Sequence, residues 1–323
     1  MIKSLKIANK TFPVNIIQGP LAGYSCSAFR LLTWQQSQPA FTCTEMISCN
    51  GLTQKSRENY RRYITKDPNE GPVCFQIFGK EPDKIGYAAN FVTDCGADLI
   101  DINCGCPVKK VRKQGAGSSL LLEPKTLYKL LIAMRNNTHL PIAAKIRVEG
   151  NSQDKFNAEI LKVVIDSGID FLVVHGRHWN QTYQDACHYE QIKFFVDNLK
   201  IPVIGNGNVF CLDSLKQMFA TGCAGVMVAR GGIGQPWLIK KLIMQMQGQE
   251  FIAPTAAQIG EIFIQHAELL ARLMDSEKFA LLQARKVAGI YTNGLINKKD
   301  FCAAVHNCET IEKLKTICSE YFI

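Results

Sequence analysis

Short apolar runs recur along the chain as far as Gly231, and polar or glycine residues follow nearly every run. Several runs consist almost entirely of Val, Ile, Leu and Ala, which is typical of parallel strands buried on both faces. The stretches between them are long enough for crossover helices. Eight such units favour an α/β fold, a closed (β/α)8 TIM barrel, over an open doubly wound sheet. The runs are VNIIQGPL, FTCTEMI, VCFQIFG, LIDINCG, PIAAKIRV, FLVVHGR, PVIGNGNV and GVMVARG.

After Trp237 the pattern changes to apolar residues at every third or fourth position, which indicates helices without further strands. The clearest examples are AAQIGEIFIQHAELLARLM, KFALLQARKVAGIYTNGL and IEKLKTICSEYF. Gly248 and Pro254 interrupt the pattern. We therefore expect a barrel over residues 1–248 and a small C-terminal all-helical domain over residues 249–323.

The composition is that of a soluble globular protein, with 323 residues of which 47% are hydrophobic and 20% charged. No window approaches the ~20 apolar residues that a membrane span needs, and the start, MIKSLKIANKTFP, lacks a secretory apolar core. The 13 cysteines are odd in number and scattered, which excludes a complete internal disulfide framework and favours a reducing compartment. We expect a cytoplasmic protein that does not associate with membranes. Since no C-x-x-C pair occurs, we expect no metal site.

The net charge is +9, and the excess lies before the helical region. From Met244 to Ile323 there are 8 Lys or Arg against 9 Asp or Glu, which leaves 29 against 19 in the preceding part. A basic surface attracts phosphate backbones through counterion release. The alternative is a merely soluble basic enzyme.

The segment DINCGCPVKKV, from Asp101 to Val111, carries the strongest chemical signal. It predicts a buried strand that ends in a tight turn and continues into a basic loop. Cys106 at this turn is the first catalytic candidate. A thiol near its ordinary pKa of ~8.5 donates a proton, whereas cations that lower this pKa favour a thiolate nucleophile; both roles stay open. The cations expected to attract a polyanionic substrate are Lys109, Lys110, Arg112 and Lys113.

Glycine-rich turns follow the last two apolar runs, GNGNV and ARGGIG. In barrels of this type the corresponding loops commonly bind phosphate, because glycines let backbone N–H groups approach the anion. Arg230 adds a charge with fork geometry. Taken singly, each turn has the simpler explanation of a chain reversal, but the two together favour a phosphate site.

Other polar residues stand at the ends of the middle runs. Lys145 could form a Schiff base, place a positive charge beside an electron-rich cofactor ring, or pair with a core carboxylate such as Glu45 or Asp101. Arg147, two residues later, should point to the same side of its strand, and Arg177 should likewise face the way of His175.

His175 could act as an acid, a base or a hydrogen-bond donor. Gln76 and Asn103 are neutral amides that can read the edge of a heterocyclic ring. The simpler alternative for all three is that they satisfy polar groups at strand ends.

The DINCGCPVKKV motif, followed by GAGSSLL, resembles the active-site signature of the tRNA-dihydrouridine synthases, and of their bacterial B-type branch in particular. The resemblance extends over most of the chain. It includes GPLAG, TEM, QIFG, KIR, HGR, NGN and ARGGIGQPW, and in the helical tail ARKVAGIY and SEYF.

This resemblance implies an FMN-dependent enzyme that reduces the C5–C6 double bond of particular uridines in tRNA, with NADPH first reducing the flavin. It implies an FMN-binding catalytic barrel and a helical tRNA-binding domain, with no obligatory protein partner. Cys106 would protonate C5 while hydride moves from flavin N5 to C6. The residues implied to hold FMN are Pro20, Leu21, Ala22, Gln76, Lys145, His175, Asn206, Gly207, Asn208, Ala229 and Arg230. Those expected to contact the tRNA, whose target base must leave its stack, are Asn103, Lys109, Lys110, Arg147, Arg177, Arg285 and Lys286.

Three other functions compete with this one. An FMN barrel that reduces a free pyrimidine or enone would bind flavin and ignore tRNA. A Schiff-base aldolase would use Lys145 and be colourless, and a tRNA-binding protein on an inactive barrel would not need Cys106. Because no Rossmann fingerprint is present, we expect the nicotinamide to bind at the flavin's own face.

Overall fold

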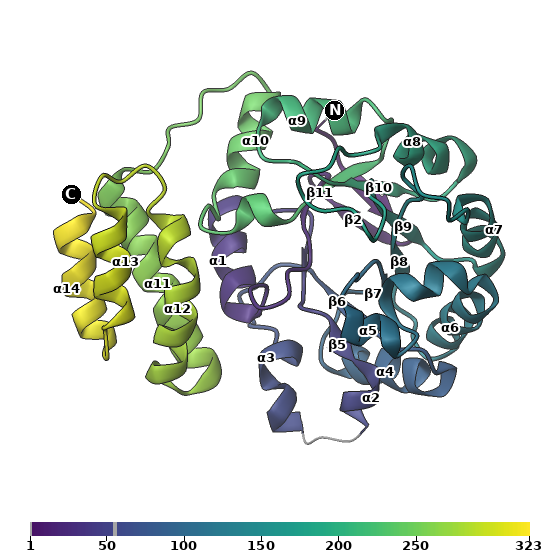
Figure 1. Cartoon of the computed structure of the whole chain (residues 1–323), viewed down its shortest axis with the longest axis horizontal. Helices are drawn as coiled ribbons and strands as arrows, with labels where there is room; N and C mark the ends of the chain where they lie inside the picture. Colours follow the sequence, from purple (N-terminus) through teal and green to yellow (C-terminus); the bar gives the residue numbers. More distant parts are fainter. Residues whose placement is uncertain (1, 54–56) are drawn as a thin grey trace.

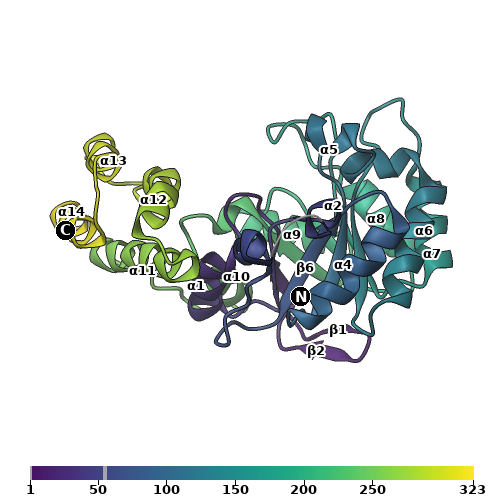
Figure 2. The ribbon, with the colours of Figure 1, turned by 90° about the horizontal axis from the view of Figure 1, so that it is seen from below.

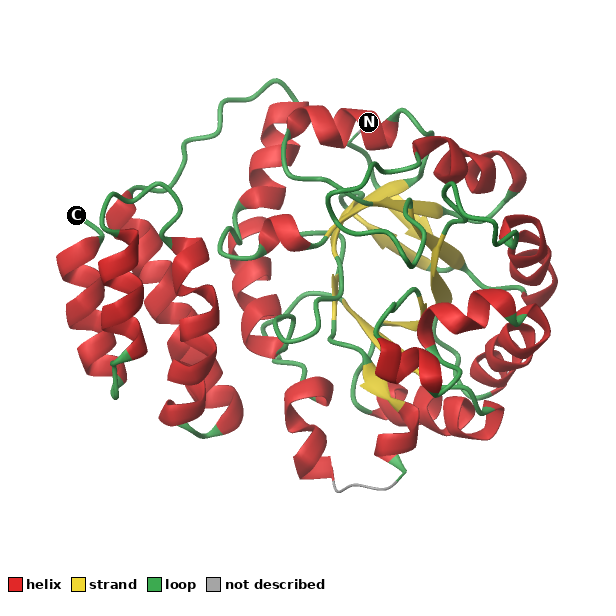
Figure 3. Ribbon diagram, viewed as in Figure 1, coloured by secondary structure: helices red, strands yellow, loops and turns green. Residues whose placement is uncertain are grey.

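A parallel β-barrel forms the larger part of the molecule (Figures 1 and 3). The computed structural model describes residues 2–53 and 57–323. The strand order is β4-β3-β11-β10-β9-β8-β7-β6-β5, and an additional β4–β6 pairing closes the ring. The predicted (β/α)8 barrel is thereby confirmed. The strands are β3 (Ile16–Gln18), β4 (Thr42–Cys43), β5 (Ile47–Ser48), β6 (Val73–Phe78), β7 (Leu99–Cys104), β8 (Ile142–Arg147), β9 (Phe171–His175), β10 (Val203–Asn206) and β11 (Gly225–Val228).

The second barrel strand is broken into β4 and β5. Both pieces pair with β6, Thr42 opposite Val73 and Ile47 opposite Ile77. The interruption falls where Glu45 ion-pairs with a side chain outside the sheet. The apolar run FTCTEMI predicted one continuous strand.

Helices surround the barrel and cover its outer face (Figure 3). Local signals set several of their ends. Proline stands at the first turn of α4 and α6, where its missing N–H costs nothing, and α7 ends at Gly168 with φ +62°. The helices are α1 (Ser27–Ser37), α2 (Cys49–Leu52), α3 (Arg61–Ile64), α4 (Pro82–Asp94), α5 (Lys109–Lys113), α6 (Pro124–Asn136), α7 (Asn157–Ser167), α8 (Tyr189–Asn198), α9 (Leu212–Phe219) and α10 (Leu238–Met246), with 3-10 turns η1 (Arg57–Tyr60), η2 (Gly117–Leu122) and η3 (Arg230–Gly232).

A short antiparallel hairpin, β1 (Leu5–Ile7) and β2 (Lys10–Phe12), lies across one end of the barrel (Figure 2). Phe12 packs on Phe41 with ring centroids 5.4 Å apart, and Phe41 packs edge-on against Phe171 at 6.1 Å. These residues belong to one buried apolar cluster that fills this end of the barrel. Any cavity in the barrel must therefore open at the opposite end, where the strands finish.

Four helices follow the barrel and stand beside it (Figures 1 and 2). They are α11 (Ala256–Met274), α12 (Glu277–Tyr291), α13 (Lys298–His306) and α14 (Ile311–Tyr321). Thr255 and Gln258 begin α11 with a reciprocal capping box. The helices share one apolar core with α1 of the barrel, in which Phe263 and Phe301 pack near Leu31. The predicted C-terminal helical region is therefore present and packs on the barrel. Within residues 2–53 and 57–323, no helix has both the length and the apolarity that crossing a membrane requires.

Candidate active site

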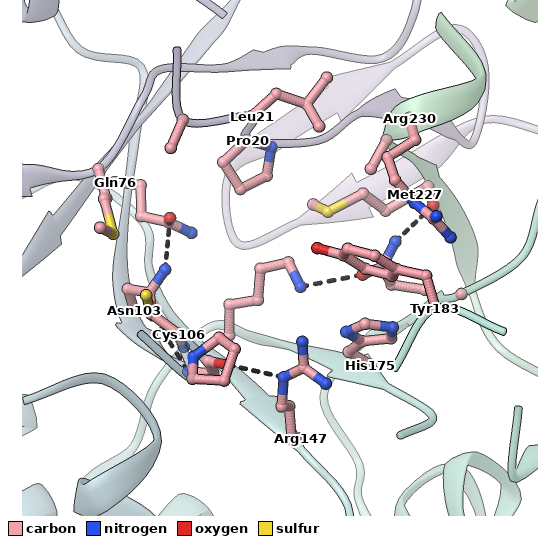
Figure 4. Close-up of a pocket in the computed structure, with 18 of the residues that line it drawn as sticks. Pro20, Leu21, Gln76, Asn103, Cys106, Arg147, His175, Tyr183, Met227 and Arg230 are labelled. Atoms are coloured by element: carbon pink, nitrogen blue, oxygen red, sulfur yellow. Dashed lines mark hydrogen bonds between the residues drawn. The ribbon is translucent and has the colours of Figure 1, made fainter. Parts of the chain in front are cut away.

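One cavity of about 440 Å³ opens at the carboxyl ends of the barrel strands (Figure 4). Its volume lies within the range of small-molecule and cofactor sites. Most of the residues that the sequence singled out line it. They are Pro20, Leu21, Ala22, Gln76, Asn103, Cys106, Lys145, Arg147, His175, Asn206, Gly207, Asn208, Ala229 and Arg230.

The loop after β7 fixes the position of Cys106. The Asn103 side-chain oxygen accepts hydrogen bonds from the backbone N–H of Cys106 at 2.8 Å and of Gly105 at 3.1 Å. On the other side, the Cys106 carbonyl accepts from the backbone N–H of Ser118 at 3.1 Å. Gly117 has φ +62°, and a Cβ there would lie 2.8 Å from the Cys106 carbonyl oxygen. The GAGSS segment therefore packs so closely against Cys106 that only glycine fits at position 117.

Three side chains form a relay that sets this loop, the buried Asp101 and Gln76 and the partly buried Asn103, and we call it the amide relay. Gln76 Nε2 donates to Asp101 Oδ2 at 2.6 Å, and Asn103 Nδ2 donates to Gln76 Oε1 at 2.8 Å. When Asp101 is ionised, its oxygens only accept, so the Gln76 amide nitrogen faces Asp101 and the Gln76 oxygen is left for Asn103. The same constraint turns the Asn103 oxygen toward Cys106. The orientation of both amides therefore follows from Asp101, whose pKa burial raises to about 7.

Burial also governs the protonation of the cysteine. It raises the pKa of Cys106 above 9.0, while the backbone N–H of Val108 and the positive charge of Arg147 act in the opposite direction and less strongly. The thiol is therefore protonated at neutral pH. Of the two roles that the sequence leaves open, this environment favours the proton donor over the thiolate nucleophile.

Arg147 braces the cysteine loop. Its Nε donates to the Gly105 carbonyl at 2.7 Å and its Nη1 to the His178 carbonyl at 3.0 Å. The side chain is 5% exposed, so these bonds satisfy a buried cation. Arg147 thus connects the loop after β7 to the loop after β9.

Lys145 extends into the middle of the site. Its Nζ donates to Asn206 Oδ1 at 2.9 Å, and Asn206 Nδ2 donates in turn to the Met227 carbonyl at 2.9 Å. Burial lowers the pKa of Lys145 to about 8, and the nearby Asp101 partly offsets this effect. Glu45, the other carboxylate considered as a partner, forms an ion pair with Arg62 at 2.7 Å instead. Lys145 consequently keeps a largely protonated amine close to the cavity at neutral pH.

His175 is 8% exposed and lies among cations. Burial is the main reason that its pKa is well below 6.5, and the charges of Arg147 and Lys145 add to the effect. The imidazole is therefore neutral and serves as a hydrogen-bonding group.

The opposite side of the cavity is suited to an anion. Gly207 and Asn208 both have positive φ, at 137° and 51°, and a Cβ on Gly207 would lie 2.8 Å from Cys187 Sγ. Turns of this kind present backbone N–H groups to anions. Arg230 stands beside them at the start of η3. Figure 4 shows Arg230 and Tyr183 across the cavity from Cys106 and Asn103.

Arg177 does not line the cavity, so the expectation that it faces the way of His175 is wrong. Its side chain is fully buried, and its Nε donates to the Asp185 carbonyl at 2.9 Å while its Nη2 reaches the Tyr183 carbonyl at 3.2 Å. The physical reason is that β9 ends at His175, so the alternation of a strand does not continue to Arg177.

The other predicted cations also lie outside the cavity. Lys109 and Lys110 are exposed on α5, so the expected basic loop is a short helix. Arg285 donates to the Cys308 carbonyl at 3.3 Å within the helical region. Lys286 is exposed beside a separate hollow between barrel and helices, together with Arg62 and other residues.

Several lining residues were missed by sequence reasoning. Most are loop residues without a periodic pattern, and the clearest available signal was an aromatic residue soon after HGR. They are Met46, Gly105, Pro107, Val108, Tyr183, Val209, Phe210 and Met227.

The donor set suits an organic anion with a flat polar ring. Pro20, Leu21 and Met227 provide apolar wall, Gln76 an amide edge, and Arg230 a cationic end. Among the described residues, no three His, Cys, Asp or Glu side chains are grouped so as to hold a metal ion.

Comparison with known families gives a consistent match. The family model described as Dihydrouridine synthase (Dus) matches residues 17–322. A "Probable tRNA-dihydrouridine synthase" of Rickettsia bellii is 32% identical over 304 residues, covering 94% of this chain and 93% of the relative. The "tRNA-dihydrouridine synthase B" of Shewanella oneidensis is 31% identical over 312 residues, covering 95% of each.

Similar solved structures share the fold at low identity. An old yellow enzyme homologue from Zymomonas mobilis superposes with a TM-score of 0.56 and 11% identity, covering 76% of this chain and 92% of that chain. Morphinone reductase gives a TM-score of 0.55 and 11% identity, covering 79% and 91%. These likenesses support the barrel fold alone.

Proposed function

The chain belongs to the dihydrouridine synthase family, and on this premise we propose that it is an FMN-dependent oxidoreductase that reduces particular uridines of tRNA to dihydrouridine with NADPH. The names of its relatives support the reaction and the RNA substrate. The observation that carries the proposal is the placement of Cys106, a partly buried, protonated thiol held by the amide relay at a cavity whose far side is cationic.

The lining of the cavity fits FMN. We assign Pro20, Leu21 and Ala22 to the flavin ring's apolar contact, with Gln76, Lys145 and His175 at its polar atoms. Asn206, Gly207, Asn208, Ala229 and Arg230 would hold the phosphate. The bound flavin would supply the hydride. Lys145 would place a positive charge beside the flavin ring, where negative charge develops on reduction. This electrostatic stabilisation is strongest in a site shielded from water.

Cys106 would supply the proton to C5 of the uracil ring. The S–H bond breaks as the C–H bond forms, and a thiolate remains on the enzyme. The Val108 N–H and the Arg147 charge, which both favour the thiolate, would stabilise it until solvent returns the proton. Arg147 and Asn103 thus hold the acid and stabilise its conjugate base.

The RNA would reach the cavity mouth across both parts of the molecule. We assign Lys109 and Lys110 on α5, and Arg285 and Lys286 on α12, to backbone phosphates. Under this proposal residues 1–248 form the catalytic FMN-binding domain and residues 249–323 the tRNA-binding domain. The target base must be extruded from its stack, because a stacked base cannot enter a cavity at the mouth of the barrel.

The test is anaerobic incubation of the purified protein with FMN, unmodified tRNA and either NADPH or NADH, followed by nucleoside mass spectrometry. We expect uridine in tRNA to gain two hydrogens, and free uridine to stay unchanged; the two reductants together show which nicotinamide the enzyme uses. Oxidation of NADPH with enones or free pyrimidines, but not with tRNA, would contradict the proposal and favour a small-molecule reductase. A colourless protein that borohydride traps with a carbonyl substrate would favour the aldolase.

A further inference from the structure

Tyr183 combines an exposed position with a contact in the candidate site. Its side chain is 56% exposed, yet it lines the cavity, and the Arg230 guanidinium carbon lies 3.7 Å from its ring centroid. Phe210, 46% exposed, lies 5.4 Å from the same guanidinium. Among the residues that the structure describes, the Arg230 side chain has no ion pair and no hydrogen bond. Stacking is therefore the contact that fixes its direction.

The segment carrying Tyr183 is held from inside the protein. Arg177 is fully buried and donates to the carbonyls of Tyr183 and Asp185. The Asp185 carboxylate closes a tight turn by accepting from the Thr182 hydroxyl at 2.8 Å. Burying a guanidinium is costly unless its donors are satisfied; these bonds satisfy Nε and Nη2 of Arg177, while its Nη1 has no hydrogen-bond partner among the described residues. The bonds also remove much of the freedom that an exposed loop aromatic would otherwise have.

The stacked geometry leaves the N–H donors of the Arg230 guanidinium free to bind an anion. A guanidinium stacks through its flat face, whereas its N–H donors lie in the plane and point outward. Those donors suit two oxygens of one phosphate at once. Without the ring, the long side chain would spread over several rotamers and lose entropy on binding the anion.

We propose that Tyr183 is a positioning residue for phosphate, acting by holding the Arg230 guanidinium edge toward the cavity. This inference rests on the proposed function, since FMN is the phosphate-bearing ligand assigned to the site. Tyr183 acts through Arg230 and needs no contact with the ligand itself.

The test compares FMN with riboflavin, which has the same ring system and no phosphate. Flavin-free full-length protein is titrated with each ligand, and binding is followed by quenching of flavin fluorescence. Tyr183→Leu should weaken FMN by about twofold to fivefold, the size of a partly exposed cation–π contact, and leave riboflavin unchanged. Tyr183→Phe keeps the ring and should bind FMN like the wild type. Tyr128→Leu, which removes an exposed tyrosine on α6 outside the cavity, is the matched control.

A second experiment, in protein that lacks the Arg230 guanidinium, shows whether Tyr183 acts through Arg230 or contacts the ligand directly. In Arg230→Met protein, adding Tyr183→Leu should cause no further loss of FMN affinity. Equal weakening of FMN and riboflavin by Tyr183→Leu, or an undiminished loss in the Arg230→Met background, would overturn the inference and leave the proposed function standing. A wild-type protein that binds neither flavin would overturn both.

Discussion

The two sides of the cavity are held in place by different means. On one side, Cys106 is positioned by backbone hydrogen bonds and by the amide relay of Asp101, Gln76 and Asn103; we call this the acid end. On the other side, glycine-rich turns and Arg230 stand beside exposed aromatic rings; we call this the anion end. The acid end depends on directional bonds among buried groups, and the anion end on charge and stacking near solvent.

The difference follows from what each end has to do. A proton donor must lie within hydrogen-bond reach of the atom it protonates, so small displacements are costly. Attraction between a cation and a phosphate falls off gradually with distance and tolerates small displacements. We therefore expect substitutions at the acid end to reduce turnover, and substitutions at the anion end to reduce ligand affinity.

The largest effect should come from removing the thiol. Cys106→Ala should lower the rate of dihydrouridine formation by about 10²- to 10⁴-fold, the usual contribution of a general acid, with FMN affinity unchanged. Turnover is measured by nucleoside mass spectrometry and flavin uptake by absorbance. Cys211→Ala, at an exposed cysteine, should behave like the wild type. An equal loss in both variants would contradict the role of Cys106.

A substitution in the amide relay should have the second-largest effect on turnover. Asn103→Leu leaves the backbone N–H groups of Gly105 and Cys106 and the Gln76 oxygen without partners; these groups are partly buried, so each costs less than the ~1–3 kcal/mol of a fully buried group. We expect kcat to fall about 10- to 100-fold through misplacement of the acid, with FMN affinity nearly unchanged. Parallel losses in kcat and FMN affinity would show that the two ends are not separate. Urea unfolding reports the accompanying loss of stability.

The buried carboxyl that begins the relay should give a pH signature. Because the folded-state pKa of Asp101 is raised from 3.8 to about 7, the folded protein holds a proton in this window that the unfolded chain has lost. Its contribution to stability therefore falls as pH rises from about 4 to about 7.

Asp101→Asn removes this titration. As pH rises from about 4.5 to about 6, the unfolding free energy of the wild type should fall by roughly 1–2 kcal/mol relative to that of the variant. Urea denaturation at each pH measures this difference. Identical pH profiles for the two proteins would show that Asp101 titrates normally.

The smallest effect should come from cations outside the cavity. Replacing Lys109 and Lys110 together by Ala should raise the KM for tRNA a few-fold and weaken its dependence on salt, because two phosphate contacts are lost. FMN affinity and kcat should not change. Steady-state assays at two salt concentrations measure this, and a KM that stays at the wild-type value would remove α5 from the RNA contact.

The sequence predicted the barrel and the helical region because both rest on long periodic patterns. Buried strands such as Phe171–His175 and Gly225–Val228 read as nearly unbroken apolar runs. The hairpin Leu5–Phe12 was not predicted, since each of its strands has only three residues and includes polar residues that face solvent. The interruption of the second barrel strand between Cys43 and Ile47 was not predicted either, because the apolar pattern does not indicate it.

The site was predictable where a residue stands at a strand end, and less so in loops. Gln76 and Lys145 lie in the second half of a barrel strand and His175 ends one, and all three line the cavity as expected. Arg177 lies just beyond its strand, where alternation no longer fixes direction, and Tyr183 lies in a loop whose course depends on that arginine. Their roles follow from tertiary contacts that no local pattern records.

The role of Cys106 as proton donor is tested by the pH dependence of its alkylation by iodoacetamide, measured peptide by peptide with mass spectrometry so that the other cysteines do not interfere. Only the thiolate reacts, so the rate follows the ionisation of this one group. We expect a slow reaction at neutral pH whose midpoint lies above the ordinary pKa of a cysteine thiol, because burial raises the pKa of Cys106. A midpoint below about 7 would show a resident thiolate and contradict the assignment of Cys106 as the proton donor.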